Sequence, residues 1–376
     1  MMTLDYLGKG IRKLGFGLMR LPMIDGDVDI EQTKQMVDLF MEKGFTYFDT
    51  AYGYIGGKSE EAAKTAIVDR YPRESFQLAT KLPAWAGPKT AKEAQDMFWT
   101  SLKRTGAGYF DFYLLHNLGA HRTKAFDDYG IWDFALERKK EGLIKHLGFS
   151  MHAAADRLDE ILAAHPEMEF VQLQINYSDW ESSTVQSRKC YETARKYNKP
   201  VIIMEPVKGG ALAKLPESAS NILREANPGV SAASWAIRFG ASLDGVITVL
   251  SGMSTIDQMR DNISFMENFQ PLDEDERSVI EHVREALAGI PQIPCTDCKY
   301  CEKGCPKNVA IPGTFTVMND YLIYRNLERA KGSYHWETLV RTKASECIAC
   351  GRCEAVCPQN ISIIDELGKA SAVLES

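Results

Sequence analysis

Four side chains with complementary acid–base chemistry follow strand-like segments of this sequence. Asp49 and Tyr54 lie in the stretch Phe-Asp-Thr-Ala-Tyr-Gly-Tyr, Lys81 ends the next strand-like segment, and His116 ends the one after that. A buried carboxylate beside a phenol requires a cation to compensate its charge, and Lys81 is the candidate. Because the functional residues of a parallel α/β barrel lie at the carboxyl ends of its strands, we expect these four side chains to converge there.

These residue types suit the reduction of a carbonyl group, which requires a hydride and a proton. A phenol with a pKa of about 10 is a weak proton donor at neutral pH, and an adjacent ammonium stabilises the phenolate and lowers that pKa. We therefore expect Lys81, held by Asp49, to activate Tyr54 as the general acid in reduction and the base in oxidation. His116 is expected to hydrogen-bond the carbonyl oxygen and orient it.

A second group of reactive residues lies near the C-terminus, where eight of the nine cysteines follow residue 290. They form two copies of the bacterial ferredoxin pattern, Cys295-x-x-Cys298-x-x-Cys301-x-x-x-Cys305-Pro and Cys347-x-x-Cys350-x-x-Cys353-x-x-x-Cys357-Pro. In that pattern three cysteines bind one [4Fe–4S] cluster and the fourth binds the other. We expect Cys295, Cys298, Cys301 and Cys357 on one cluster, and Cys305, Cys347, Cys350 and Cys353 on the other. Zinc is the alternative, but its four ligands explain neither the third cysteine nor the Cys-Pro pair.

Alternating strand-like and helix-like segments precede the cysteines and must position the acid–base residues. Strands are expected near residues 14–19, before Asp49, and at 76–81, 109–115, 143–149, 170–176, 200–204 and 245–250. Helices are expected at 30–43, from Ser59, at 90–104, 130–140, 153–164, 184–196, 231–239 and 255–265. This alternation predicts parallel β-α units. Eight strands, with no Gly-x-Gly-x-x-Gly after the first, favour a closed (β/α)8 TIM barrel over a doubly wound sheet.

The length of 376 residues leaves room for a second domain, because one barrel takes about 250 residues. An amphipathic helix at 273–288 precedes a segment with two prolines, which reads as a boundary. We predict a barrel domain at 1–290 and a small, mostly helical dicluster ferredoxin-like domain at 291–376.

Composition narrows the classes of partner and the compartment. The net charge of −7 gives no reason to expect nucleic acid or an anionic membrane as a partner. No apolar run has the length of a signal peptide or a membrane span, so we expect a cytoplasmic protein. Nine cysteines in such a protein indicate metal or redox chemistry rather than structural disulfides.

The segments around Asp49 and Tyr54, at 79–81 and at 115–117 resemble the active-site segments of the aldo-keto reductases in order and spacing. The resemblance runs from about Leu14 to about Asn262. It implies an oxidoreductase that reduces a small carbonyl substrate, or oxidises an alcohol, with NAD(P)H. It also implies that the four acid–base residues are the catalytic tetrad.

The cofactor contacts implied by the resemblance carry over unevenly. Ser150 and Gln174 match contacts to the nicotinamide carboxamide, and the adenosine-side matches are Ser254, Gln258, Asp261 and Asn262. Many members place an aromatic ring after the seventh strand, where this chain has Glu205. The arginine that often grips a 2′-phosphate is absent at 258, and Lys208 or Arg260 is the candidate substitute. We expect NADP or NAD, with NADP slightly favoured.

The C-terminal segment resembles the helical dicluster domains that are fused to larger redox enzymes. It implies that the clusters exchange electrons with a partner such as ferredoxin. A hydride carries two electrons and a cluster accepts one, so a relay between them would require a flavin. Met151 and the missing aromatic ring keep a flavin-dependent electron-transfer enzyme as an alternative. A non-catalytic iron–sulfur redox sensor is the other alternative, although it would not need Tyr54 and Lys81 together.

Overall fold

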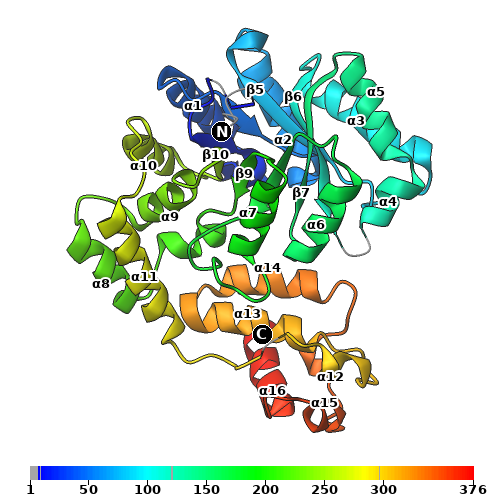
Figure 1. The fold of residues 1–376 in the computed structure, drawn as a ribbon, viewed down its shortest axis with the longest axis vertical. Coiled ribbons are helices and arrows are strands. Elements are labelled where there is room, and N and C mark those ends of the chain that lie inside the picture. Colours follow the sequence, from blue (N-terminus) through cyan, green and yellow to red (C-terminus); the bar gives the residue numbers. More distant parts are fainter. Residues whose placement is uncertain (1–6, 9, 120–121, 296) are drawn as a thin grey trace. The chain divides into compact units, whose positions relative to one another are not determined.

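The computed structural model describes residues 7–8, 10–119, 122–295 and 297–376. These residues form two compact units (Figure 1). The first unit contains the chain up to Lys208 together with Ala233–Arg277, and the second contains Gly209–Ala232 and Ser278–Ser376. The domain boundary between residues 290 and 291 stays a prediction.

Eight parallel strands close into a barrel in the first unit. They are β1 (Leu14–Gly17), β4 (Tyr47–Asp49), β5 (Gln77–Leu82), β6 (Phe110–Leu118), β7 (Ile144–Met151), β8 (Phe170–Gln174), β9 (Val201–Met204) and β10 (Val246–Ser251). Strand β1 pairs with both β10 and β4, which completes the ring. The predicted (β/α)8 barrel is therefore confirmed. A short hairpin, β2 (Met23–Ile24) and β3 (Asp27–Val28), follows the first strand.

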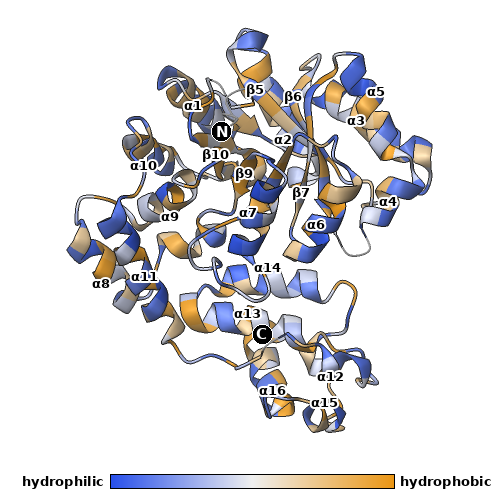
Figure 2. Cartoon of the chain, viewed as in Figure 1, coloured by the Kyte–Doolittle hydropathy of each residue, from blue (hydrophilic) through white to orange (hydrophobic). Residues whose placement is uncertain are grey.

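The predicted helices alternate with these strands. They are α1 (Ile30–Glu42), α2 (Lys58–Ala63), α3 (Ala91–Thr105), α5 (Ile131–Lys140), α6 (Ala155–Ala164), α7 (Ser187–Lys196), α9 (Ala232–Ala241), α10 (Ile256–Met266) and α11 (Glu274–Ala288). Helices α1, α3 and α10 begin after Asp29, Thr90 and Thr255, whose side chains accept a backbone N–H of the first turn. Figure 2 shows both polar and apolar residues along the helices, as expected for elements with one buried face.

Two further helices, α4 (Thr123–Asp128) and α8 (Glu217–Ala226), were absent from the sequence-based assignment. Helix α4 is short, and α8 buries only Ala219 and Leu223, so few apolar positions mark either helix. Among the described residues, no helix is long and apolar enough to cross a membrane.

Apolar side chains fill the barrel interior. Tyr47, Phe112, Phe170 and Ile202 belong to one buried cluster contributed by four different strands. A Cβ at Gly148 of β7 would lie 2.4 Å from the carbonyl oxygen of Phe170, so glycine lets strand β8 pack closely there. This packing fixes the strands whose carboxyl ends carry the candidate site.

The second unit is helical apart from its cysteine loops. It includes α12 (Tyr300–Lys303), α13 (Ile311–Tyr324), α14 (Leu327–Glu337), α15 (Arg352–Ala355) and α16 (Ile363–Leu374). Helices α13, α14 and α16 contact one another around a core that includes Phe315, Tyr334 and Leu367 (Figure 1). Arg325, with a φ of 53°, ends α13 and separates it from α14. Trp336, on α14, is 66% exposed.

Candidate active site and cluster-binding cysteines

Asp49, Tyr54 and Lys81 meet at the carboxyl rim of the barrel, as their spacing predicted. Lys81 Nζ donates to Asp49 Oδ1 at 2.5 Å, to the carbonyl oxygen of Thr50 at 2.8 Å and to Tyr54 Oη at 3.4 Å. The side chains of Lys81 and Asp49 are almost completely buried, whereas Tyr54 is partly exposed. One ammonium group therefore joins a buried carboxylate to a phenol that faces the rim.

His116 completes the group from the end of β6. Its ring lies edge-on to Tyr54, with the centroids 5.9 Å apart and an interplanar angle of 80°. Trp85 Nε1 donates to the carbonyl oxygen of His116 at 2.8 Å, which holds the backbone of this residue. His116 Nδ1 is buried and has no hydrogen-bond partner within the described chain.

A sharp turn after β4 returns Tyr54 to Lys81. Ile55, Gly56 and Gly57 have φ values of 51°, 63° and 97°, a conformation that glycine adopts without strain. At Gly57 a side chain would also collide, since a Cβ would lie 2.7 Å from Cζ of Arg104. Glycine at position 57 is thus required by both backbone conformation and space.

A buried carboxylate that sequence reasoning missed supports this turn. Glu60 is fully buried, and its oxygens accept from Thr80 Oγ1 at 2.7 Å and from Arg104 Nη1 at 3.3 Å. Arg104 also donates to the carbonyl oxygen of Tyr52 at 3.0 Å. Glu60 stands in the first turn of a helix, where a surface position is the ordinary expectation, so only the three-dimensional packing reveals its role.

Burial dominates the electrostatics of the four residues. It raises the pKa of Tyr54 above the ordinary value, although Lys81 acts in the opposite direction. The expected net lowering of this pKa is therefore wrong, because burial outweighs the effect of Lys81, and the Asp49 carboxylate also acts to raise the pKa. Burial alone would lower the pKa of Lys81, but Asp49 and Tyr54 raise it, so the ammonium stays charged. Burial lowers the pKa of His116 well below the ordinary value, and its imidazole is neutral.

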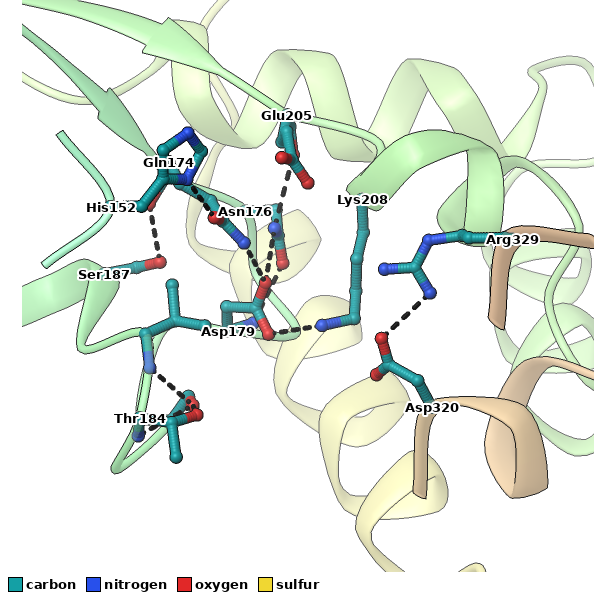
Figure 3. Close-up of polar contacts among 12 residues, drawn as sticks. His152, Gln174, Asn176, Asp179, Thr184, Ser187, Glu205, Lys208, Asp320 and Arg329 are labelled. Atoms are coloured by element: carbon teal, nitrogen blue, oxygen red, sulfur yellow. Dashed lines mark hydrogen bonds and ion pairs between the residues drawn. The ribbon is translucent and has the colours of Figure 1, made fainter. Parts of the chain in front are cut away.

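Ser150 and Gln174, the predicted carboxamide contacts, each keep one hydrogen-bond donor. Ser150 Oγ accepts the backbone N–H of Asn117 at 2.9 Å, which leaves its hydroxyl proton available. Gln174 Oε1 lies 3.0 Å from Nδ1 of His152, and its Nε2 donates one of its two protons to Asp179 Oδ2 at 3.2 Å (Figure 3). Two remaining donors match the two lone pairs of an amide carbonyl oxygen, so these residues fit a nicotinamide carboxamide.

Lys208 lies in a buried ion pair. Its Nζ is 2.6 Å from Asp179 Oδ1, while Asn176 Nδ2 donates to Asp179 Oδ2 at 2.9 Å (Figure 3). Burial opposes ionisation of Asp179, but Lys208, Asn176 and Gln174 together hold its pKa below the ordinary value. The positive charge of Lys208, which was expected to face a 2′-phosphate, is thus compensated by Asp179. Nothing in the sequence had indicated Asp179 as its partner.

Glu205 follows β9 where the resemblance leads one to expect an aromatic ring. Its backbone has a φ of 52°, and its carbonyl oxygen accepts from Asn176 Nδ2 at 3.2 Å. The Glu205 carboxylate is one of the charges that act to raise the pKa of Tyr54. It therefore belongs to the electrostatic surroundings of the tetrad.

The predicted adenosine-side residues lie in and just before α10. Ser254 Oγ donates to the carbonyl oxygen of Arg20 at 2.8 Å, and its backbone N–H donates to Gln258 Oε1 at 2.7 Å. Asn262 Nδ2 donates to Ser251 Oγ at 2.6 Å, and Asp261 lies on the same helix.

Arg20 is a cation beside this segment that sequence reasoning missed. Its side chain is exposed and has no ion pair with a described residue. A Cβ at Gly252 would lie 3.4 Å from Cδ of Arg20, so the arginine runs along the segment. Arg260, in contrast, pairs with Asp257 at 3.0 Å.

The C-terminal cysteines surround two cavities. One, the Cys347 cavity, is lined by Cys305, Cys347, Cys350 and Cys353. The other, the Cys295 cavity, is lined by Cys295, Cys298, Cys301 and Cys357. This grouping matches the two expected ligand sets, and the ligation itself stays a prediction. Among the described residues, no group of three or more His, Cys, Asp or Glu side chains is arranged to hold a single metal ion.

The two cysteine runs form a structural repeat with an offset of 52 residues. Asp297 and Ala349 have φ values of 53° and 52°, and Asn308 and Asn360 have values of 52° and 51°. Helices α12 and α15 occupy equivalent positions, as do the starts of α13 and α16. Left-handed residues in such loops turn successive N–H groups toward an anion, which suits a sulfur-rich cluster. One such donor is visible as the backbone N–H of Val309, 3.4 Å from Cys305 Sγ.

Comparison with protein-family models finds two matches along the chain. Residues 13–285 match the model described as the aldo/keto reductase family, and residues 294–362 match the one described as a 4Fe-4S dicluster domain. The chain is 22% identical over 310 residues to the uncharacterized oxidoreductase YqkF of Bacillus subtilis, covering 74% of this chain and 94% of that protein.

Other relatives match the barrel region. The chain is 26% identical over 131 residues to an aldo-keto reductase of Mycolicibacterium smegmatis, spanning 35% of this chain and only 44% of the relative. Aldo-keto reductase AKR11C1 from Bacillus halodurans, in its holo form, has a TM-score of 0.59 at 24% identity and covers 74% of this chain and 95% of its own. The aldo/keto reductase of Klebsiella pneumoniae in complex with NADP and acetate has a TM-score of 0.58 at 19% identity, over 73% of this chain and 92% of its own. These structures share the barrel fold.

Proposed function

Because the chain belongs to the aldo/keto reductase family and carries a 4Fe-4S dicluster domain, we propose that it reduces a small carbonyl compound, or oxidises the matching alcohol, with NAD(P)H. The observation that carries this proposal is the hydrogen bonding of Lys81 to both Asp49 and Tyr54 at the barrel rim. No purely structural role requires a buried ammonium to lie against the phenol of a tyrosine at the barrel rim.

The four residues divide the work on the carbonyl group. NAD(P)H supplies the hydride when it is bound. Tyr54 Oη donates the proton to the carbonyl oxygen, and Lys81 stabilises the phenolate that remains. His116, being neutral, can donate one hydrogen bond to the same oxygen and align it. The phenol of Tyr54 carries its proton at neutral pH, as a donor must, and Lys81 acts against burial to lower its pKa.

Three residues support the nucleotide assignment. The free donors of Ser150 and Gln174 suit the carboxamide of a nicotinamide. Arg20 supplies a positive charge beside Ser254, where a 2′-phosphate would favour NADP over NAD. The Klebsiella pneumoniae relative, whose structure contains NADP, supports the same preference.

The eight cysteines of the dicluster domain would hold two [4Fe–4S] clusters, which exchange single electrons with a partner protein. Glu205 keeps one alternative open, since a carboxylate replaces the aromatic ring beside the tetrad. A flavin-dependent electron-transfer reaction on the same barrel is that alternative. An anaerobic preparation that neither contains flavin nor gains flavin absorption when incubated with FMN would eliminate it.

The proposal is tested by replacing Tyr54 with phenylalanine. Removal of the proton donor should lower turnover of small aldehydes and ketones by about 10²- to 10⁴-fold. Tyr52→Phe is the matched control, because Tyr52 lies in the same turn and its ring contacts Arg104 rather than Lys81. Cluster content, followed by absorption and EPR, should be equal in both variants. Turnover that survives Tyr54→Phe would remove the tetrad from the reaction.

A further inference from the structure

The two cysteine cavities differ in the charge and exposure of the residues around them. Lys307 and Ile348 line the Cys347 cavity, and no carboxylate does. Ile348 is 56% exposed, and its neighbour Cys350 is exposed too. A cluster held in this cavity would therefore lie beneath an accessible apolar side chain and an accessible lysine.

More positive and apolar surface adjoins Lys307. Thr342 Oγ1 donates to the carbonyl oxygen of Lys307, which places Val340, 83% exposed, close by along the chain. Arg352 precedes Cys353 and is exposed, and a Cβ at Gly304 would lie 4.0 Å from its Cβ. Neither Lys307 nor Arg352 forms an ion pair within the part of the chain that the structure describes.

The Cys295 cavity has different surroundings. Its lining lysine, Lys299, is compensated by Asp297 at 3.5 Å. A second carboxylate, that of Glu337, is close enough to Asp297 to be affected by its charge. Burial raises the pKa of Glu337 most, and the charge of Asp297 raises it further. Of the two lysines that line a cavity, only Lys307, at the Cys347 cavity, has no carboxylate partner in the part of the chain that the structure describes.

We propose that Lys307, Arg352, Ile348 and Val340 form a docking surface for a small acidic one-electron carrier protein, which exchanges electrons with the cluster of the Cys347 cavity. We call these four residues the basic–apolar face. The inference rests on the proposed function only in requiring that this cavity holds a [4Fe–4S] cluster.

Charge complementarity selects the class of partner. The whole chain has a net charge of −7 and would repel an acidic protein, so productive encounter needs a local positive region. Exposed apolar groups among positive charges provide the dry centre and charged rim of a transient interface. A basic carrier would instead be repelled at this face, as would any partner that relied on cationic contacts.

The same charges favour electron arrival at this cluster. Reduction by the carrier moves one electron and no proton: the carrier loses one electron, and the oxidised cluster gains one negative charge. Lys307 and Arg352 stabilise that added charge, and the N–H of Val309 does so at Cys305 Sγ. The cluster of the Cys347 cavity should therefore be reduced before the cluster of the Cys295 cavity.

The experiment measures electron transfer between the full-length, cluster-loaded protein and two carriers of opposite charge. Flavodoxin hydroquinone is the acidic donor, and its oxidation is followed by anaerobic stopped-flow absorption. Oxidised cytochrome c is the basic acceptor for the pre-reduced protein. In the variant Lys307→Glu/Arg352→Glu, the second-order rate constant with flavodoxin should fall about tenfold or more at low salt, and the rate with cytochrome c should rise.

A matched control reverses two charges elsewhere. Lys92→Glu/Lys369→Glu alters net charge equally at two exposed lysines that line neither cavity. This control should change the flavodoxin rate less than twofold. If EPR shows that Lys307→Glu lowers the cluster content, the single variant Arg352→Glu replaces the double variant in the rate measurement. Arg352 does not line the cavity, so its substitution should leave the cluster in place.

Several outcomes would overturn the proposal. Equal slowing in the control would mean that overall charge alone steers the carrier, and an unchanged rate in the face variant would place docking elsewhere. A shift in oligomeric mass by light scattering, limited to the face variant, would assign the face to a second copy of this chain. Tyr54→Phe should leave these rates unaltered, so failure of the docking proposal is distinct from failure of the carbonyl reaction.

Discussion

Lys81 and burial have opposite effects on the pKa values of Asp49 and Tyr54. Lys81 stabilises the ionised form of Asp49 and of Tyr54, yet burial still raises the pKa of both. Residue types and spacing were sufficient to predict that these side chains meet, because strand ends in a barrel share one rim. The net shift of the Tyr54 pKa was not predictable, since it depends on how completely the folded chain excludes water.

His116 should make the folded barrel sensitive to mild acid. In the unfolded chain its imidazole takes up a proton below a pH of about 6.5, while burial keeps the folded form neutral. The unfolded state then binds more protons, so stability falls as the pH drops through this window, by at most about 1.4 kcal/mol per pH unit. Urea unfolding of His116→Gln, followed by tryptophan fluorescence, should show a smaller loss between pH 7 and 5.5.

His335→Gln provides the comparison for this measurement, because His335 is exposed. Its pH dependence should equal that of the unaltered protein. If His116→Gln retains the full acid sensitivity, another group is responsible and the buried imidazole is not neutral.

Arg20 should decide between the two nicotinamide nucleotides. Arg20→Ala should raise the KM for NADPH about tenfold or more and leave that for NADH nearly unchanged, since a charge-assisted hydrogen bond contributes roughly 1.5–3 kcal/mol. Arg260→Ala is the matched control, because Asp257 already compensates Arg260. Similar losses with both nucleotides would indicate a role at the shared part of the cofactor or in folding. The sequence suggested Lys208 or Arg260 for this role. It did not reveal that Lys208 is already paired, because its partner Asp179 is distant in sequence.

Among the secondary-structure elements, those with many regularly spaced apolar residues were predicted correctly from the sequence. Elements with few apolar residues were missed. The alternation of strand-like and helix-like segments identified the barrel strands and helices such as α3. Helix α8 escaped notice because it buries only Ala219 and Leu223. The turn after β4 could be anticipated from its glycines, but its clamp by Glu60 and Arg104 could not, as charged residues ordinarily lie at the surface.

The crossed ligation that we expect for the cysteine repeats predicts a specific pattern of cluster loss. Cys357→Ser should halve the iron content, and adding Cys298→Ser should remove little more, because both residues line the Cys295 cavity. Adding Cys350→Ser instead should abolish both clusters, since that residue lines the Cys347 cavity. Iron analysis and EPR of the reconstituted proteins provide the measurement. Uncrossed ligation would reverse the behaviour of the two double variants.

In the whole molecule, the two units have cores of different kinds. The barrel core consists of apolar side chains from its strands, whereas the buried core of the second unit includes Cys301 and Cys353. A small helical unit with cysteines in its core should depend on its clusters for stability, as metal binding and folding are coupled in such modules.

Removing the clusters by oxidation and chelation should therefore loosen one unit only. Amide hydrogen exchange should accelerate at least tenfold in α13, α14 and α16 and change less than twofold in the barrel strands. Exchange measured by mass spectrometry before and after cluster removal tests this. Uniform acceleration throughout the chain would show that the barrel also relies on the clusters, and unchanged exchange in the helices would show a self-sufficient module.

The 52-residue offset between the two cysteine runs also determines when, during synthesis, each set of four cysteines is complete. The barrel's last strand ends at Ser251, so its strands have all been made well before the second cysteine run emerges. The Cys347 cavity lacks a full set of thiols until Cys353 is translated, and the Cys295 cavity until Cys357. Since chains grow at roughly 5–20 residues per second, all barrel strands are made several seconds before either set of cysteines is complete. The two sets are then completed almost together, so a chain released before Cys353 contains every barrel strand and neither complete set.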